Sequence, residues 1–212
     1  MTRRTRLLAA SLSVLVLAPV AATAGPPLVC FPIDIGGAKS LPWGSGPGWN
    51  AARGDYDRAH LVTDTLALLA PSTPVLVRME TLRRATIYAM SDAGIARGLL
   101  ARVEERAREG KATGRTGALA LFDTGYLIEV YKQARAITRR EMVDAARDGY
   151  AMMEQALARL GPDPDLEYAA ALVTVDGRME VSRRHLDKAM ESAPTGSPLA
   201  RTIESHRGLW RR

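Results

Sequence analysis

The side chains best suited to chemistry are three histidines, one cysteine and the serines close to them in sequence. His60, His185 and His206 are far apart, and no two of them stand at the spacing of metal ligands. With a single cysteine, a zinc site is not expected. Ser182 and His185 lie one helical turn apart, but the sequence identifies no acid to orient the histidine. We therefore predict no metal, no cofactor and no catalytic residue.

Motifs for phosphate binding and hydrolysis are also absent from the sequence. No G-x-S-x-G or G-x-G-x-x-G segment occurs, and the glycine-rich segment 110–117 (GKATGRTG) lacks the order of a P-loop. Paired carboxylates leave no such signature, because folding can bring acidic residues together from distant parts of a chain. An enzyme of unrecognised type, for example one acting on glycans, therefore remains an alternative.

The first 24 residues have the composition of an export signal. Three arginines within the first six residues precede an apolar run over 7–20, and an A-x-A site ends at Ala24, directly before Gly25. This order predicts a signal peptide over 1–24 that is cleaved between Ala24 and Gly25, and a mature chain in the periplasm or extracellular space. The apolar run is shorter than the ~20 residues that cross a bilayer as a helix, so a retained anchor is the less favoured alternative.

Removal of this leader changes the charge of the chain. The full sequence has 29 Lys and Arg against 23 Asp and Glu, which gives a net charge of +6. Cleavage takes away three arginines and no acidic residue, so the mature chain keeps half of this surplus. Nucleic-acid-binding domains carry a larger and clustered surplus, so we expect no nucleic-acid partner.

Cys30 is the only cysteine, so no disulfide can form within the chain. Lipid attachment would need a small residue before the cysteine, where Val29 stands. A disulfide between two molecules is a second option. We favour a buried, inert thiol beside Phe31 and Ile33, because free cysteine behaves as a small hydrophobe.

Glycine and proline interrupt residues 25–53 too often for regular secondary structure. The same segment carries too many large apolar side chains for a free linker. We predict an extended, non-helical N-terminal arm laid over a helical body, with Trp43 and Trp49 filling gaps in that body. The alternative is that the two tryptophans form an exposed binding site.

Over residues 54–212 the apolar residues repeat at helical spacing, and no strand-like alternation is long enough to build a sheet. We therefore predict one all-α domain over 54–212. Thr138 and Glu141 have the spacing of a capping box that opens a helix, and charged side chains such as Arg106 are expected on a solvated face. Proline and glycine divide this domain into helices at about 55–70, 74–90, 92–109, 118–136, 139–160, 165–175, 178–193 and 198–210.

Two short segments, 153–157 (MEQAL) and 186–190 (LDKAM), share one pattern. Residues 166–194 resemble a tetratricopeptide repeat (TPR), in which pairs of antiparallel helices stack on one another. The matching positions are Leu166, Ala170, Ser182, Leu186, Ala189 and Pro194. The resemblance implies a TPR-like α-α solenoid, or superhelix, of stacked antiparallel hairpins. It also implies a concave face for a partner, with Tyr126 of the weaker match over 125–134 as a candidate contact.

These features together predict an exported scaffold or adaptor that binds a protein or peptide partner in the cell envelope. The candidate partner-binding residues are Trp43, Trp49 and Tyr126. Any membrane contact is expected to be transient or peripheral, through residues 210–212 and the basic last helix. The segment 30–44 also resembles the opening of uncharacterised exported bacterial proteins, which implies no activity.

Overall fold

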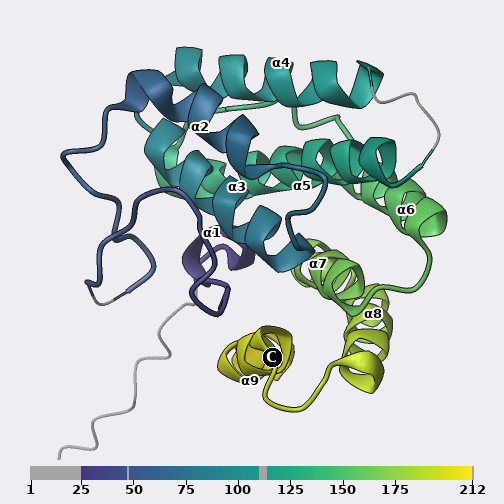
Figure 1. The fold of residues 1–212 in the computed structure, drawn as a ribbon. Coiled ribbons are helices and arrows are strands. Elements are labelled where there is room, and N and C mark those ends of the chain that lie inside the picture. Colours follow the sequence, from purple (N-terminus) through teal and green to yellow (C-terminus); the bar gives the residue numbers. More distant parts are fainter. Residues whose placement is uncertain (1–24, 47, 110–113, 212) are drawn as a thin grey trace, which may run out of the picture.

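The computed structural model describes residues 25–46, 48–109 and 114–211 (Figure 1). These residues form helices and contain no strand beyond an isolated bridge between Trp43 and Ala52. The all-α prediction is therefore confirmed. The helices, with the two 3-10 helices labelled η, are α1 (Pro27–Cys30), η1 (Arg58–His60), α2 (Leu61–Leu68), α3 (Val75–Ala89), α4 (Ala93–Glu109), α5 (Arg115–Thr138), α6 (Gly149–Leu160), α7 (Pro164–Thr174), α8 (Met179–Ser192), α9 (Pro198–His206) and η2 (Arg207–Trp210).

The longest helix, α5, lies at the centre of the molecule and packs against α1, α3, α4, α6 and α7 (Figure 1). Its sequence is apolar on two sides, and both sides are buried: Phe122 and Tyr126 belong to one row, Ile128 to the other. A helix that is hydrophobic over most of its circumference must have neighbours on several sides. The broad apolar pattern of this segment thus has a direct structural explanation.

Two glycines allow α5 and α6 to cross in close contact. A Cβ atom on Gly125 would fall on the carbonyl oxygen of Gly149, and a Cβ atom on Gly149 would fall on that of Gly125. Only glycine permits two helix backbones to approach so closely. The amide of Gly149 also donates to Glu129 Oε1 at 2.8 Å. The start of α6 is therefore fixed to the middle of α5.

The start of α6 differs from the prediction. Thr138 is the last residue of α5, and its hydroxyl accepts a hydrogen bond from Arg140 N. Arg139 leaves the helix in a left-handed conformation, with φ at 58°. A loop follows, and Asp148 caps α6 by accepting from a backbone N–H of its first turn. The capping box of Thr138 and Glu141 is therefore wrong, because burial of α5 extends that helix through the expected cap.

The segment 25–53 contains the short helix α1, although it was predicted to be entirely non-helical. Pro27 occupies the first turn of α1, where a missing N–H costs nothing. Leu28 and Val29 from this helix are buried, as is Leu41 farther along. These side chains belong to the same hydrophobic core as those of α3 and α5.

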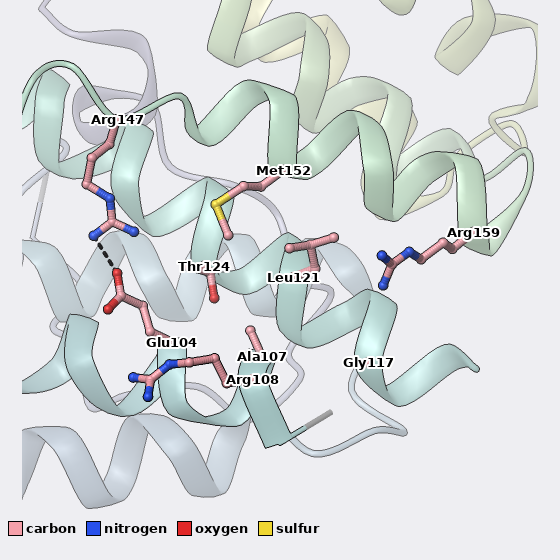
Figure 2. Close-up of a pocket in the computed structure, with 9 residues that line it drawn as sticks. All are labelled: Glu104, Ala107, Arg108, Gly117, Leu121, Thr124, Arg147, Met152 and Arg159. Carbon is pink, nitrogen blue, oxygen red and sulfur yellow. Dashed lines mark ion pairs between the residues drawn. The ribbon is translucent and has the colours of Figure 1, made fainter. Parts of the chain in front are cut away.

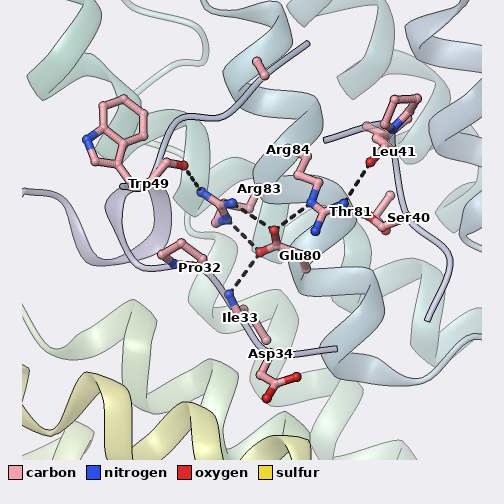
Figure 3. A network of polar contacts seen from close by, with 12 residues as sticks. Pro32, Ile33, Asp34, Ser40, Leu41, Trp49, Glu80, Thr81, Arg83 and Arg84 are labelled. Carbon is pink, nitrogen blue, oxygen red and sulfur yellow. Dashed lines mark hydrogen bonds and ion pairs between the residues drawn. The ribbon is translucent and has the colours of Figure 1, made fainter. Parts of the chain in front are cut away.

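Buried charged side chains of α3 bind the backbone of this segment (Figure 3). Glu80 Oε2 accepts from Ile33 N at 3.1 Å, and the two Glu80 oxygens accept from Arg83 at 2.7 and 2.8 Å. Arg83 Nη1 donates to the carbonyl oxygens of Val29 and Trp49, both at 2.9 Å. An irregular segment has no hydrogen-bond ladder of its own, so α3 pairs the backbone groups that burial would otherwise leave unsatisfied.

The last helix holds the same segment from the other side. Asp34 N donates to Thr202 Oγ1 at 3.0 Å, and the Asp34 carboxylate accepts from Arg201 Nε at 2.6 Å. His206 Nε2 donates to the carbonyl oxygen of Pro32 at 3.0 Å. Residues near the two ends of the described chain therefore form one packed region.

Candidate functional site

A cleft of about 400 Å³ lies between α4, α5 and α6 (Figure 2). It combines a small apolar floor with a rim of charged side chains. The lining residues are Glu104, Ala107 and Arg108 of α4, Gly117, Leu121 and Thr124 of α5, Arg147 of the loop before α6, and Met152 and Arg159 of α6. We call this site the α4–α6 cleft.

The floor of the α4–α6 cleft consists of residues that the core leaves partly uncovered. Leu121 is only partly buried, whereas the next residue of α5, Phe122, is fully buried. Met152 points from α6 into the cleft, toward Thr124 (Figure 2). Methionine is flexible and polarizable, so it adapts to ligands of different shape. Gly117 also lines the cleft and adds no side chain.

The rim carries three arginines and one glutamate. Arg147 forms an ion pair with Glu104 across the cleft (Figure 2). Glu104 Oε1 is buried and has no hydrogen bond of good geometry within the described residues. The ion pair with Arg147 therefore compensates the charge of the Glu104 carboxylate. Arg108 and Arg159 are exposed, and neither forms an ion pair among the described residues. The donors of these two arginines are thus available to a ligand.

This arrangement suits a ligand that is apolar in one part and acidic in another. The floor removes an apolar group from water, which stabilises binding by roughly 25 cal/mol per Å² of buried area. The guanidinium groups of Arg108 and Arg159 present several N–H donors in a planar fork that matches a carboxylate. Within the described residues, no group of three or more His, Cys, Asp or Glu side chains could hold a metal ion.

The two tryptophans predicted as packing anchors contact α3, not the cleft. Trp43 is partly buried, and its ring meets Tyr88 edge to face with centroids 5.8 Å apart. The guanidinium groups of Arg83 and Arg84 lie 5.2 and 5.3 Å from the Trp43 ring centroid. Trp49 is also partly buried against the core. Cation–π contacts of this kind hold the segment on α3.

Tyr126, predicted as a partner contact, lies at 0% exposure in the core. Its ring stacks on Phe122 with centroids 5.7 Å apart, and its hydroxyl has no hydrogen-bond partner within the described residues. Burial raises the pKa of this phenol well above its usual value, so it stays neutral. In this conformation Tyr126 has no surface to offer a partner.

No known protein family, curated protein or solved structure matches this chain. Among the described residues, no helix is both long and apolar enough to cross a membrane. The predicted signal peptide over 1–24, with Ala24 at its end, lies outside the described residues. Gly25, on the other side of the predicted cleavage site, is the first residue described and lies against the Cys30 side chain.

Cys30 is a free, partly buried thiol. Burial raises its pKa, against a smaller lowering effect from the charge of Arg83. A raised pKa reduces the fraction of the reactive thiolate. The inert thiol that we favoured from the sequence remains a prediction, and this pKa supports it.

Few features of the sequence pointed to the residues that line the α4–α6 cleft. Charged residues of α4 were expected in solvent, but Arg106 instead donates to the carbonyl oxygens of Leu66 and Leu69 at 3.1 and 2.7 Å, and so caps α2. Arg147 was expected inside a helix and lies in a loop. The available signal was the second apolar row of α5, in which Leu121 is only partly buried.

Proposed function

We propose that this protein is a helical scaffold that binds a partner protein through a peptide segment held in the α4–α6 cleft. The segment would place an apolar side chain on the floor, against Leu121 and Met152. Its acidic side chains would pair with Arg108 and Arg159. The single observation that carries this proposal is an apolar floor beside two arginines that form no ion pair among the described residues.

The architecture that we propose for this scaffold is two stacked helical hairpins, α5 with α6 and α7 with α8. The packing of α6 on α5 and of α8 on α7 supports it. Four positions of the TPR-like pattern are buried: Leu166, Ala170, Ser182 and Ala189. The Ser182 hydroxyl donates to Ala171 O at 2.7 Å, which joins α8 to α7. Small residues at such positions let helix pairs approach each other.

We further propose that the scaffold works outside the cytoplasm, in the cell envelope. The leader-like residues 1–24 support this location. A partner there would be a protein with an exposed acidic and apolar segment. No cofactor is needed for such a role.

A screen of the mature chain, residues 25–212, against a peptide library tests this function. We expect the bound peptides to share one apolar residue flanked by Asp or Glu. The affinity of such a peptide should fall about tenfold or more in Arg159→Glu, because a charge-assisted hydrogen bond contributes roughly 1.5–3 kcal/mol. Fluorescence anisotropy of the labelled peptide would measure the change.

Arg97→Glu is the matched control, since Arg97 is exposed on α4 outside the cleft. It makes the same change of charge and should leave the affinity within about twofold. Equal losses in Arg97→Glu and Arg159→Glu would mean general electrostatic attraction, and would reject the α4–α6 cleft as the site. Bound peptides without acidic residues would reject the proposed ligand chemistry.

A further inference from the structure

A second cleft, of about 360 Å³, lies between α6 and α8. We propose that it is a binding site for a small oxyanion of the phosphate or carboxylate class, separate from the α4–α6 cleft. The lining residues are Tyr150 and Glu154 of α6, Arg178 directly before α8, and Val181, Arg184, His185 and Lys188 of α8. We call it the α6–α8 cleft.

The α6–α8 cleft is separate from the first because α6 lies between them. Successive residues of a helix are 100° apart, so residues two positions apart point in nearly opposite directions. Tyr150 and Glu154 therefore line the α6–α8 cleft, whereas Met152 lines the α4–α6 cleft. The second cleft also has no apolar floor like that of Leu121 and Met152, so it suits a hydrophilic ligand.

A chain of hydrogen bonds from three helices positions one donor in this cleft. Glu167 Oε2 of α7 lies 2.5 Å from His185 Nδ1, and His185 Nε2 lies 2.8 Å from the Tyr150 hydroxyl. The side chains of Glu167 and His185 are 7% and 13% exposed. An ionised carboxylate can only accept, so Nδ1 carries a proton and Nε2 faces the tyrosine. These two hydrogen bonds fix the orientation of the Tyr150 hydroxyl. Linked donors and acceptors orient catalytic groups in many active sites in the same way.

Two members of this hydrogen-bonded series, Tyr150 and His185, line the cleft, and Tyr150 supplies the hydroxyl. The residue is 4% exposed, and its hydroxyl can both donate and accept one hydrogen bond. Burial, followed by hydrogen bonding to Glu154, raises the pKa of Tyr150 to about 12. The phenol therefore keeps its proton at neutral pH. It is a donor for an anion and not a nucleophile.

Three cationic side chains, Arg178, Arg184 and Lys188, line the cleft, against one acidic side chain, Glu154. Arg178 lies over the Tyr150 ring with its guanidinium carbon 4.2 Å from the centroid. A guanidinium stacked on a ring keeps its N–H edges free for an oxyanion. Arg184 and Lys188 are one helical turn apart on α8, and Lys188 also reaches Glu167 at 3.4 Å.

The Tyr150 hydroxyl has one proton, so it can donate to His185 Nε2 or to an anion in the cleft, but not to both at once. A bound anion therefore competes with His185 for this donor.

Isothermal titration calorimetry with sulfate and with acetate tests the proposal on the mature chain. Sulfate represents the tetrahedral phosphate class and does not titrate near neutral pH, whereas acetate represents a carboxylate. We expect at least one of them to bind. The affinity should fall about tenfold in Tyr150→Phe and in Arg184→Ala, because each variant removes one charge-assisted hydrogen bond. Arg184 is exposed, so its variant remains informative if Tyr150→Phe is unstable.

One further variant makes the test specific. Arg159→Ala, in the α4–α6 cleft, should leave sulfate and acetate binding unchanged. Absence of binding by both anions, or an equal loss of affinity in Arg159→Ala and Arg184→Ala, would overturn the proposal. Failure of peptide binding at the α4–α6 cleft would leave it intact.

Discussion

His206 is a histidine that the fold keeps neutral. Its Nε2 donates to Pro32 O at 3.0 Å, and the Tyr168 hydroxyl donates to its Nδ1 at 2.5 Å. Phe31 meets the ring edge to face, with centroids 5.3 Å apart. Burial lowers the pKa of His206 to about 4, outweighing the raising effect of the Pro32 carbonyl. A second proton would remove the acceptor that Tyr168 uses.

We therefore expect His206 to make the folded state sensitive to acid. The unfolded chain binds this proton near pH 6.5 and the folded chain near pH 4, so the stabilisation is complete above about pH 6.5 and is lost as the pH falls toward 4. The loss amounts to about 2 kcal/mol between pH 7 and pH 5. Urea unfolding of wild type and His206→Gln across this range measures it as a difference in the free energy of unfolding.

The measured quantity must be the difference in the free energy of unfolding between wild type and His206→Gln. Other groups change the stability with pH in the opposite direction. Burial raises the pKa of Asp123 and of Asp165 to about 6, so both favour the folded state as the pH falls below 6. These contributions are common to wild type and His206→Gln and cancel in the comparison. Free energies that stay parallel from pH 7 to pH 5 would contradict the role of His206.

Single residues also show where sequence reasoning stopped. Ser182 and His185 lie one helical turn apart on α8, the spacing of a serine–histidine pair, but their side chains contact different partners. The Ser182 hydroxyl donates to Ala171 O and accepts from Trp210 Nε1, while His185 contacts Tyr150 and Glu167. The missing acid therefore exists, on another helix. Spacing within one helix predicts which side chains share a face, but not what a neighbouring helix brings to them.

At the scale of elements, the crossing of α5 and α6 at Gly125 and Gly149 positions both clefts, because α6 lines each of them. Glycine inside a helix costs roughly 0.5–1 kcal/mol relative to alanine. Gly125 lies in the interior of α5, so the close approach of the two backbones must offset that cost.

We expect Gly125→Ala to destabilise the protein by about 2 kcal/mol or more, because the new methyl group would fall on the Gly149 carbonyl, which cannot move aside cheaply. Gly98→Ala is the control: Gly98 lies inside α4, and its Cβ would meet no atom within 4 Å. The control should gain about 0.5–1 kcal/mol from helix propensity. Thermal and urea unfolding compare the two, and equal effects would reject a special role of the crossing.

The predicted combination of a capping side chain and a following proline is confirmed at the start of α9. α9 begins at Pro198 behind Ser197, whose hydroxyl accepts from Ala200 N at 3.2 Å. α7 begins at Pro164 with Asp163 as its cap, one residue before the predicted start at 165. The signal failed at Thr138, because tertiary burial extended α5 through it. Neither cleft could be predicted, because each is lined by more than one element and depends on how α6 crosses its neighbours.

At the scale of the whole molecule, α3 is the anchor for the irregular segment at the start of the described chain. Arg83 is 0% exposed and contacts Glu80 together with two carbonyl oxygens of that segment. Arg84 has a partly exposed side chain, and it contacts Glu80 and the carbonyl oxygen of Leu41 at 2.8 Å (Figure 3). The two neighbours therefore differ mainly in burial and in the number of groups they pair.

We expect Arg83→Met to destabilise the protein by about 3–5 kcal/mol, because it removes one partner of a buried ion pair and the donor to the carbonyl oxygens of Val29 and Trp49. Arg84→Met should cost clearly less, because water can reach its position. Hydrogen exchange should accelerate first at Ile33, whose amide is bound to Glu80. Equal losses in the two variants, or unchanged exchange at Ile33, would show that the network does not hold the segment.

The contacts between Pro32 and His206 and between Asp34 and Thr202 join residues 174 and 168 positions apart in sequence. Closing so long a loop costs entropy that no local helix contact repays. Most of the packing between successive helices can form early, but this closure requires α9, the last α-helix described. During synthesis the N-terminus is made first, so residues 32–34 have no partners until α9 has been made. The folding rate should accordingly be slow for an all-helical protein, with docking of α9 as the late step.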